Sequence, residues 1–94
     1  MLNAQLSHHA AKRLQQRGIP EKILPFLFEF GEESYDHHGA RVVYFNKKTR
    51  ERVSRFMGGS EFKRIQGALD VYAVLYSNDC VVTIGHRTHR IHRN

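Results

Sequence analysis

The feature that most constrains the fold lies near the start of the chain, where one segment specifies both ends of a helix. Ser7 is a favourable N-cap residue, and Gly18 is typical of the position just after a helix. Pro20 then suits the first turn of a second helix. The apolar residues of this region have helical spacing and predict a face that packs on the core: Leu6, Ala10 and Leu14.

The second helix is predicted in the most hydrophobic segment of the chain, which ends at Gly31. Ile23, Leu27 and Phe30 have the spacing of its buried face. Pro25 conflicts with a continuous helix because proline lacks the backbone N–H donor. We therefore expect a kink or a restart of the helix at Pro25.

Two pairs of strands are predicted after this segment. Residues 33–37 and 41–46 are joined by His38-Gly39, which suits a hairpin, and the second of them is rich in β-branched and aromatic side chains. Residues 69–77 and 80–87 form the second pair around the turn residues Asn78 and Asp79.

A basic segment at residues 47–57 lies between the two strand pairs and has helical spacing of its apolar residues. Gly58-Gly59 ends it, and Ser60 is a predicted cap for a short helix through Phe62, Ile65 and Leu69. This order of elements predicts the α+β class. We expect one domain of residues 1–94, with two N-terminal helices packed on one side of a mostly antiparallel sheet of about four strands.

The 94 residues carry a formal net charge of +6, concentrated in residues 12–17, 47–55 and 87–93. Clustered basic charge is typical of a protein that binds a polyanion: nucleic acid, an acidic membrane surface or an acidic protein. Cys80 is the only cysteine, which excludes an intrachain disulfide and fits a reducing cytosol. The N-terminus lacks signal-peptide features and no apolar run approaches the ~20 residues of a membrane span. We therefore expect a cytoplasmic protein with no membrane partner, whose oligomeric state the sequence does not indicate.

The first candidate site is a row on the first predicted helix. His9, Arg13 and Arg17 lie four residues apart, so their side chains share one face. An imidazole can move protons near neutral pH and guanidinium groups bind phosphate oxygens, so the row suits a phosphodiester. On this segment alone, a solvated basic helix face is the simpler interpretation.

The second candidate site is the end of the last predicted strand, where histidine and arginine alternate. If the strand continues, His86 and Arg90 fall on one face and Arg87 falls on the other. We expect His86 and Arg87 to be ordered because they adjoin an apolar strand. From Arg90 onward, a basic disordered tail is an equal alternative.

The basic segment at residues 47–55 is the third candidate. It holds Arg50, Arg52 and Arg55, which together with Lys12 are candidate RNA-binding residues. A solvated helix face is the alternative interpretation. The seven histidines have no standard metal-ligand spacing with acidic or cysteine partners, so no metal or other cofactor is expected.

Several of these segments together resemble the DUF4258 family of small, mostly bacterial proteins. The resemblance spans residues 7–93 and lies in His9-Ala10-x-x-Arg13-x-x-x-Arg17-Gly18-Ile19, Phe30-Gly31-Glu32, Val42-Val43-Tyr44-Phe45 and Val81-Val82-Thr83-Ile84-Gly85-His86-Arg87. The family is similar to the BrnT- and RelE-like toxins of type II toxin–antitoxin systems. The resemblance implies a RelE/BrnT-like fold, a ribonuclease that cleaves mRNA, and an antitoxin as protein partner. Pro25 and the long basic segment at residues 47–66 depart from the family pattern.

The leading hypothesis is a metal-independent endoribonuclease. RNA carries its own nucleophile, the 2′-hydroxyl, and cleavage needs a base, an acid and cations that stabilise the charged phosphorane. His9 and His86 are the predicted acid and base, in either order. The predicted phosphate ligands are Arg13, Arg17 and Arg87.

Two other hypotheses use the same surface. A non-catalytic module would bind nucleic acid or an acidic protein through the same cations. A structural subunit with a basic surface is the third hypothesis. Only the enzyme needs the row on the first helix to meet His86 and Arg87 in space.

Overall fold

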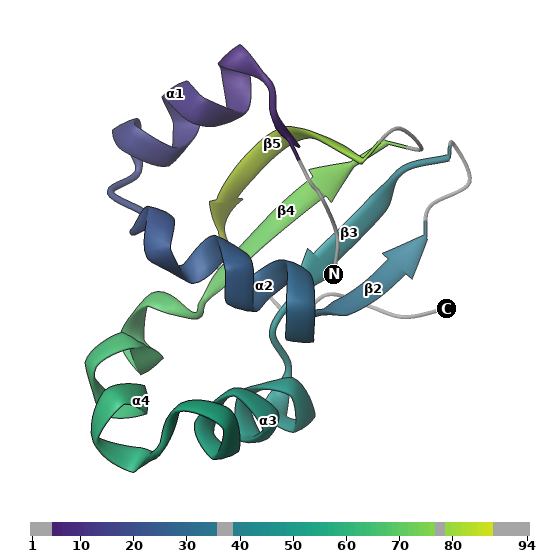
Figure 1. Cartoon of the computed structure of the whole chain (residues 1–94). Coiled ribbons are helices and arrows are strands. Elements are labelled where there is room, and N and C mark those ends of the chain that lie inside the picture. The colour runs from purple at the N-terminus through teal and green to yellow at the C-terminus, as the bar shows by residue number, and fades with distance from the viewer. Residues whose placement is uncertain (1–4, 36–38, 77–78, 88–94) are drawn as a thin grey trace.

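The computed structural model describes residues 5–35, 39–76 and 79–87, and within them the chain has an α+β fold with four α-helices and one five-stranded sheet (Figure 1). β1 runs parallel to β5, whereas the other three strand pairs are antiparallel. The predicted class and the mostly antiparallel sheet are confirmed. The strand order is β1-β5-β4-β3-β2, with bounds Gln5–Leu6 (β1), Glu32–Tyr35 (β2), Arg41–Tyr44 (β3), Val71–Leu75 (β4) and Cys80–His86 (β5).

The helices fall into two groups. α1 (His8–Gln16) and α2 (Leu24–Phe30) lie over one face of the sheet, with a 3₁₀ turn at Glu21–Ile23 between them (Figure 1). α3 (Lys47–Met57) and α4 (Gly59–Ile65) follow β3 as a helical hairpin, and a 3₁₀ turn at Gln66–Ala68 leads into β4. The two N-terminal helices therefore pack on the sheet as predicted.

Both predicted ends of α1 are confirmed. The Ser7 hydroxyl accepts a hydrogen bond from the Ala10 N–H (3.1 Å). At the other end Gly18 has a φ of 62°, and the Ile19 N–H donates to the Leu14 carbonyl (3.0 Å). This bond is typical of a Schellman motif, whose left-handed residue is usually glycine because glycine has no Cβ to clash.

The prediction at Pro25 is confirmed, because α2 restarts at Leu24 and proline falls in its first turn, where no N–H donor is needed. α2 ends at Gly31, also as predicted. A Cβ at Gly31 would lie 2.4 Å from the Leu27 carbonyl oxygen and 2.7 Å from Cγ1 of Val43. Glycine is therefore required where α2 meets β3.

The prediction of Ser60 as a helix cap is wrong. α4 begins at Gly59, and its N-cap is Gly58, which has a φ of 87°. No side-chain hydrogen bond caps α4. The side-chain cap in this region belongs to α3, where Asn46 accepts from the Thr49 N–H (2.9 Å) and Thr49 accepts from the Asn46 N–H (2.8 Å).

The fifth strand, β1, was not predicted. Leu6 was predicted on the apolar face of the first helix, but it lies in β1 and pairs with Val81. The Ser7 N–H donates to the Val81 carbonyl (2.9 Å), which ties the start of α1 to β5. A two-residue strand leaves no alternation in the sequence, so only its partner strand reveals it.

Both predicted antiparallel pairs are confirmed. β2 begins one residue earlier than predicted, at Glu32, and β3 ends two residues earlier, at Tyr44. Tyr35 pairs with Arg41 in the first, and Leu75 pairs with Val81 in the second, beside a register shift in β4. The predicted turn residues His38 and Asn78 lie outside the described residues.

The core lies between the helices and the covered face of the sheet. Fully buried side chains from α2, the segment after β3, α3 and the strands contribute to it, among them Leu27, Phe45, Val53, Leu75 and Ile84. Val53 extends this core to the α3–α4 hairpin. Within the described residues, no helix combines the length and hydropathy that crossing a membrane requires.

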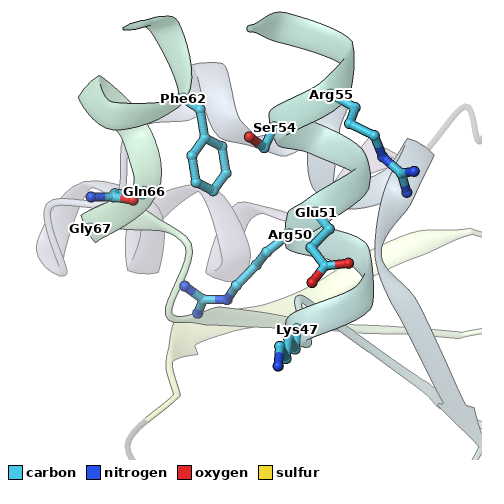
Figure 2. A pocket seen from close by; sticks show the side chains of 8 residues that line it. All are labelled: Lys47, Arg50, Glu51, Ser54, Arg55, Phe62, Gln66 and Gly67. Carbon is cyan, nitrogen blue, oxygen red and sulfur yellow. The ribbon is translucent and has the colours of Figure 1, made fainter. Parts of the chain in front are cut away.

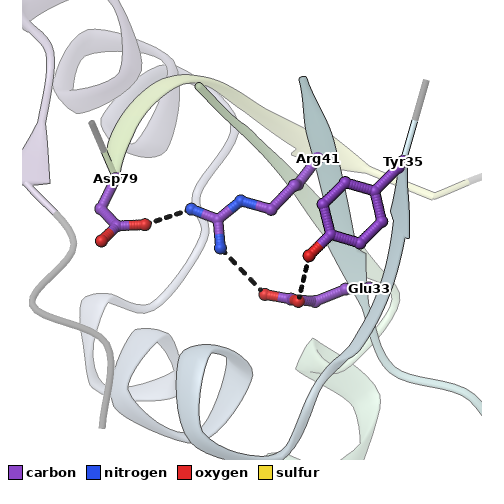
Figure 3. Close-up of polar contacts among 4 residues, drawn as sticks. All are labelled: Glu33, Tyr35, Arg41 and Asp79. Carbon is purple, nitrogen blue, oxygen red and sulfur yellow. Dashed lines mark hydrogen bonds and ion pairs between the residues drawn. The ribbon is translucent and has the colours of Figure 1, made fainter. Parts of the chain in front are cut away.

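A cluster of charged and polar side chains connects the ends of β2 and β3 to the residue before β5 (Figure 3). The Arg41 guanidinium bonds to the Asp79 carboxylate and lies 3.2 Å from Oε1 of Glu33. The Tyr35 hydroxyl donates to Oε2 of Glu33 (3.4 Å). The Asp79 hydrogen bond and the charge of Glu33 raise the pKa of Arg41 above its usual value, against the opposing effect of burial. These contacts join β2, β3 and the residue before β5, which makes them structural.

Candidate functional site

The predicted row on α1 starts with a paired imidazole and guanidinium. His9 is exposed and Arg13 is half-buried. The Arg13 Nε–H donates a hydrogen bond to Nε2 of His9 (3.3 Å). Because Nε2 is the acceptor, the neutral His9 ring carries its hydrogen on Nδ1. We refer to these two side chains as the His9–Arg13 pair.

β5 brings the other predicted histidine to the opposite end of α1. Nε2 of His86 lies 2.7 Å from the carbonyl oxygen of Arg17, although the two residues are 69 positions apart in the chain. A carbonyl only accepts, so Nε2 carries the hydrogen and the lone pair of the neutral ring is on Nδ1. The contact also satisfies one of the last carbonyl groups of α1, which have no partner within the helix. The end of the row and the end of β5 are therefore brought together.

The two histidines are not brought together. His9 precedes Arg17 by eight residues, which corresponds to about 12 Å along the helix axis at a rise of 1.5 Å per residue. Helical side chains lean toward the N-terminus, whereas the Arg17 carbonyl points toward the C-terminus, so the His9 and His86 rings diverge further. In this arrangement one phosphate group does not reach both rings.

Arg87 is directed away from the row on α1. Its Nη1 donates to the Phe45 carbonyl (2.7 Å), and its guanidinium lies 4.9 Å from the centre of the Tyr44 ring. Its backbone N–H donates to the Asp70 carbonyl (2.8 Å). These contacts join the ends of β3 and β5 to the start of β4. Arg87 therefore lies with the sheet and not with His86 at the end of α1.

A shallow hollow of about 470 Å³ lies along the start of α1. His9 and Lys12 both line it, so two predicted residues share one exposed surface. The other described residues that line it are His8, Ala11 and Gln15. The hollow gives an anionic ligand access to His9 and Lys12.

A larger groove of about 750 Å³ runs between α3 and α4 (Figure 2). Two of the three predicted arginines of this segment, Arg50 and Arg55, line it, whereas Arg52 is exposed and is not among the described lining residues. Arg50 is bound to the Asp70 carboxylate. The described residues that line this α3–α4 groove are Lys47, Arg50, Glu51, Ser54, Arg55, Phe62, Gln66 and Gly67.

Phe62 was not among the predicted site residues. Its spacing with Ile65 and Leu69 only placed it on a short helix. In the structure it packs against the core, and its half-buried ring also faces the α3–α4 groove (Figure 2). No feature of the sequence distinguishes a phenylalanine at the mouth of a groove from one fully inside the core. Arg90, the remaining predicted residue, lies outside the described residues.

The described part of the chain contains no group of three or more His, Cys, Asp or Glu side chains placed to hold a metal ion. Comparison of the chain with protein-family models, with curated proteins and with solved structures finds no match. The DUF4258 resemblance therefore stays a prediction, which the motifs alone carry.

Proposed function

We propose that the protein is an RNA-binding endoribonuclease whose reacting phosphate binds where α1 meets the end of β5. The observation that carries the proposal is the 2.7 Å contact between Nε2 of His86 and the Arg17 carbonyl, which puts a potential base beside the basic row. Both residues are exposed, so a polynucleotide can reach them. The DUF4258 resemblance points to the same class of activity.

His86 is the general base of the proposed reaction. With Nε2–H held by the Arg17 carbonyl, Nδ1 of His86 takes the proton from the 2′-hydroxyl. The 2′-oxygen attacks the adjacent phosphorus, and the 5′-oxygen leaves with a proton from water. The products are a 2′,3′-cyclic phosphate and a 5′-hydroxyl end. The Arg17 side chain stabilises the negative charge that builds up on the phosphate.

The His9–Arg13 pair and Lys12 bind the strand next to the reacting phosphate. Residues four positions apart advance about 6 Å along a helix, so Arg13 and Arg17 are spaced to contact neighbouring phosphates of one strand. Guanidinium groups bind phosphate oxygens in a bidentate way, which fixes the position of the strand. In this arrangement His9 contributes to binding and not to proton transfer.

The test is cleavage of single-stranded RNA by the purified protein in the presence of EDTA, with His86→Gln as the main variant. The glutamine amide can still donate to the Arg17 carbonyl but cannot take up a proton. We therefore expect an unchanged fold and cleavage that is slower by about 10²-fold or more.

Two controls accompany this test. Lys22→Gln removes an exposed charge between α1 and α2, outside the proposed site, and should leave the rate unchanged. A substrate with a 2′-deoxy sugar at the cleaved position should resist cleavage, because it lacks the nucleophile. The proposed chemistry is wrong if the wild-type protein cleaves the 2′-deoxy substrate as fast as RNA, or if His86→Gln cleaves RNA at the wild-type rate.

A non-catalytic RNA-binding module is the second candidate. It is favoured by the separation of His9 from His86, and by the fact that His86 also caps the end of α1. For such a module, a plot of the logarithm of the binding constant against the logarithm of salt concentration becomes less steep in Arg13→Ala and in Arg17→Ala. The slope falls by about 0.7 for each lost phosphate contact. RNA binding by the wild type without cleavage of any RNA would establish this candidate.

A further inference from the structure

We infer that the α3–α4 groove binds one unpaired nucleotide of the RNA strand, with the base stacked on Phe62 and the phosphates bound by Lys47 and Arg55 (Figure 2). The inference rests on RNA binding in the proposed function, and it does not depend on cleavage. It also goes beyond the row on α1, because the groove belongs to a different pair of helices.

The chemistry of the groove suits a base. Phe62 is the only apolar side chain among the described lining residues, and its ring faces the space between α3 and α4 (Figure 2). Aromatic rings bind unpaired bases by stacking, with little dependence on base identity. Ser54, Glu51 and Gln66 line the same space and offer hydrogen-bonding groups to the edges of a base.

The charge of the groove suits phosphate. Three cations and one carboxylate, Glu51, are among the described lining residues. Arg50 is paired with Asp70, but Lys47 and Arg55 form no ion pair with any other described residue. Both side chains line the groove, so they are available to an anionic ligand.

An acidic peptide is the other anionic occupant to weigh. An amphipathic helix docks through several apolar side chains at i, i+3, i+4 and i+7, and it needs an apolar floor of similar length. The described lining of the groove offers one ring, Phe62. A single base needs one ring and cations beside it, so the lining favours a nucleotide over a peptide helix.

A series of contacts joins the groove to the residue that follows β5. Arg50 lines the groove and binds the Asp70 carboxylate, and the Asp70 carbonyl accepts from the Arg87 N–H (2.8 Å), directly after His86. One residue, Asp70, thus links the groove to the end of β5.

The experiment measures fluorescence anisotropy of a labelled 2′-O-methyl RNA of about twelve nucleotides, within the usual site sizes of single-strand binders. This probe cannot be cleaved through its 2′-oxygen. Phe62→Leu removes the ring and keeps an apolar side chain, and we expect the Kd to rise about ten-fold. Phe62→Tyr keeps the stacking surface, so its Kd should stay near the wild-type value.

Phe56→Leu is the matched control for the ring. Phe56 is 70% exposed on α3 and packs against Phe26 and Phe30, and it is not among the described lining residues. Its substitution should leave the Kd unchanged. Thermal unfolding of each variant confirms that binding is compared between folded proteins.

The cations are tested by salt dependence. Lys47→Ala and Arg55→Ala should each lower the log–log salt slope of binding by about 0.7. Lys63→Ala removes an exposed charge of α4 outside the described lining and should leave the slope unchanged.

The outcomes separate the inference from the proposed ribonuclease activity. If Phe62→Leu binds the RNA as tightly as the wild type, the inference is wrong, whether or not RNA is cleaved. It is also wrong if Phe62→Leu loses binding of a labelled glutamate-rich peptide but not of RNA. Binding that depends on Phe62 in a protein that never cleaves RNA would support the groove and reject the ribonuclease.

Discussion

Replacement of Arg87 by alanine is expected to destabilise the fold without removing a group that acts in cleavage. The guanidinium donates to the Phe45 carbonyl (2.7 Å) and lies 4.9 Å from the centre of the buried Tyr44 ring. A hydrogen bond from a charged group contributes about 1.5–3 kcal/mol, and a cation–π contact contributes about 0.5–1 kcal/mol. Arg87→Ala should therefore lower the free energy of unfolding by about 2–4 kcal/mol.

Urea unfolding followed by circular dichroism measures this loss. For a domain of this size the free energy of unfolding falls by about 1 kcal/mol for each molar of urea, so the midpoint should drop by about 2–4 M. Stabilities of about 0.05–0.15 kcal/mol per residue leave such a variant folded in the absence of urea. Arg87→Lys keeps the charge but loses the planar guanidinium, so its midpoint should lie between those of the wild type and Arg87→Ala.

The cleavage rate then decides between the two roles of Arg87. At a temperature where Arg87→Ala is folded, its rate at saturating RNA should stay close to that of the wild type, whereas His86→Gln is slow. This reasoning is refuted if Arg87→Ala keeps the wild-type urea midpoint and loses as much cleavage activity as His86→Gln. That result would place Arg87 among the groups that contact the reacting phosphate.

Two further predictions concern the local signals that build the fold, each with a matched control. Gly31→Ala should cost about 1–3 kcal/mol, because its Cβ would meet the Leu27 carbonyl at 2.4 Å, whereas a Cβ at Gly67 meets nothing within 4 Å. Thermal unfolding should show a midpoint lower by roughly 4–8 °C for each kcal/mol in Gly31→Ala, and little change in Gly67→Ala. Ser7→Ala should cost about 1 kcal/mol because it removes the cap of α1, whereas Ser60→Ala should be close to neutral because Ser60 caps no helix. Equal midpoints within either pair would contradict the corresponding argument.

The parts of the fold that the sequence predicted are those with local causes. The ends of α1 follow from Ser7 and Gly18, and the restart of α2 follows from Pro25. β1 depends instead on a partner strand about 75 residues away, to which it is joined by the pairs Gln5–Cys80 and Leu6–Val81. A contact of that kind leaves no periodic pattern in a two-residue strand, so local reasoning did not find it.

In the candidate site, too, the arrangement within one helix was predictable from the sequence, whereas the contact between distant elements was not. The α-helical period predicted that His9, Arg13 and Arg17 share a face, but it could not predict which end of the helix His86 would reach. That depends on the position of β5 beside α1. Strand alternation had already put Arg87 on the opposite face from His86, and the two side chains contact different carbonyl groups, those of Phe45 and Arg17 respectively.

The choice of histidine at position 86 is what links the cap of α1 to the proposed chemistry. A lysine or an arginine can also bond to the last carbonyl groups of a helix, so capping alone does not require an imidazole. An imidazole that donates from Nε2 keeps a lone pair on Nδ1, and His86 is exposed, so that lone pair is accessible to a ligand. Glutamine at position 86 keeps the donor and removes the lone pair, so His86→Gln is the substitution that separates the two roles.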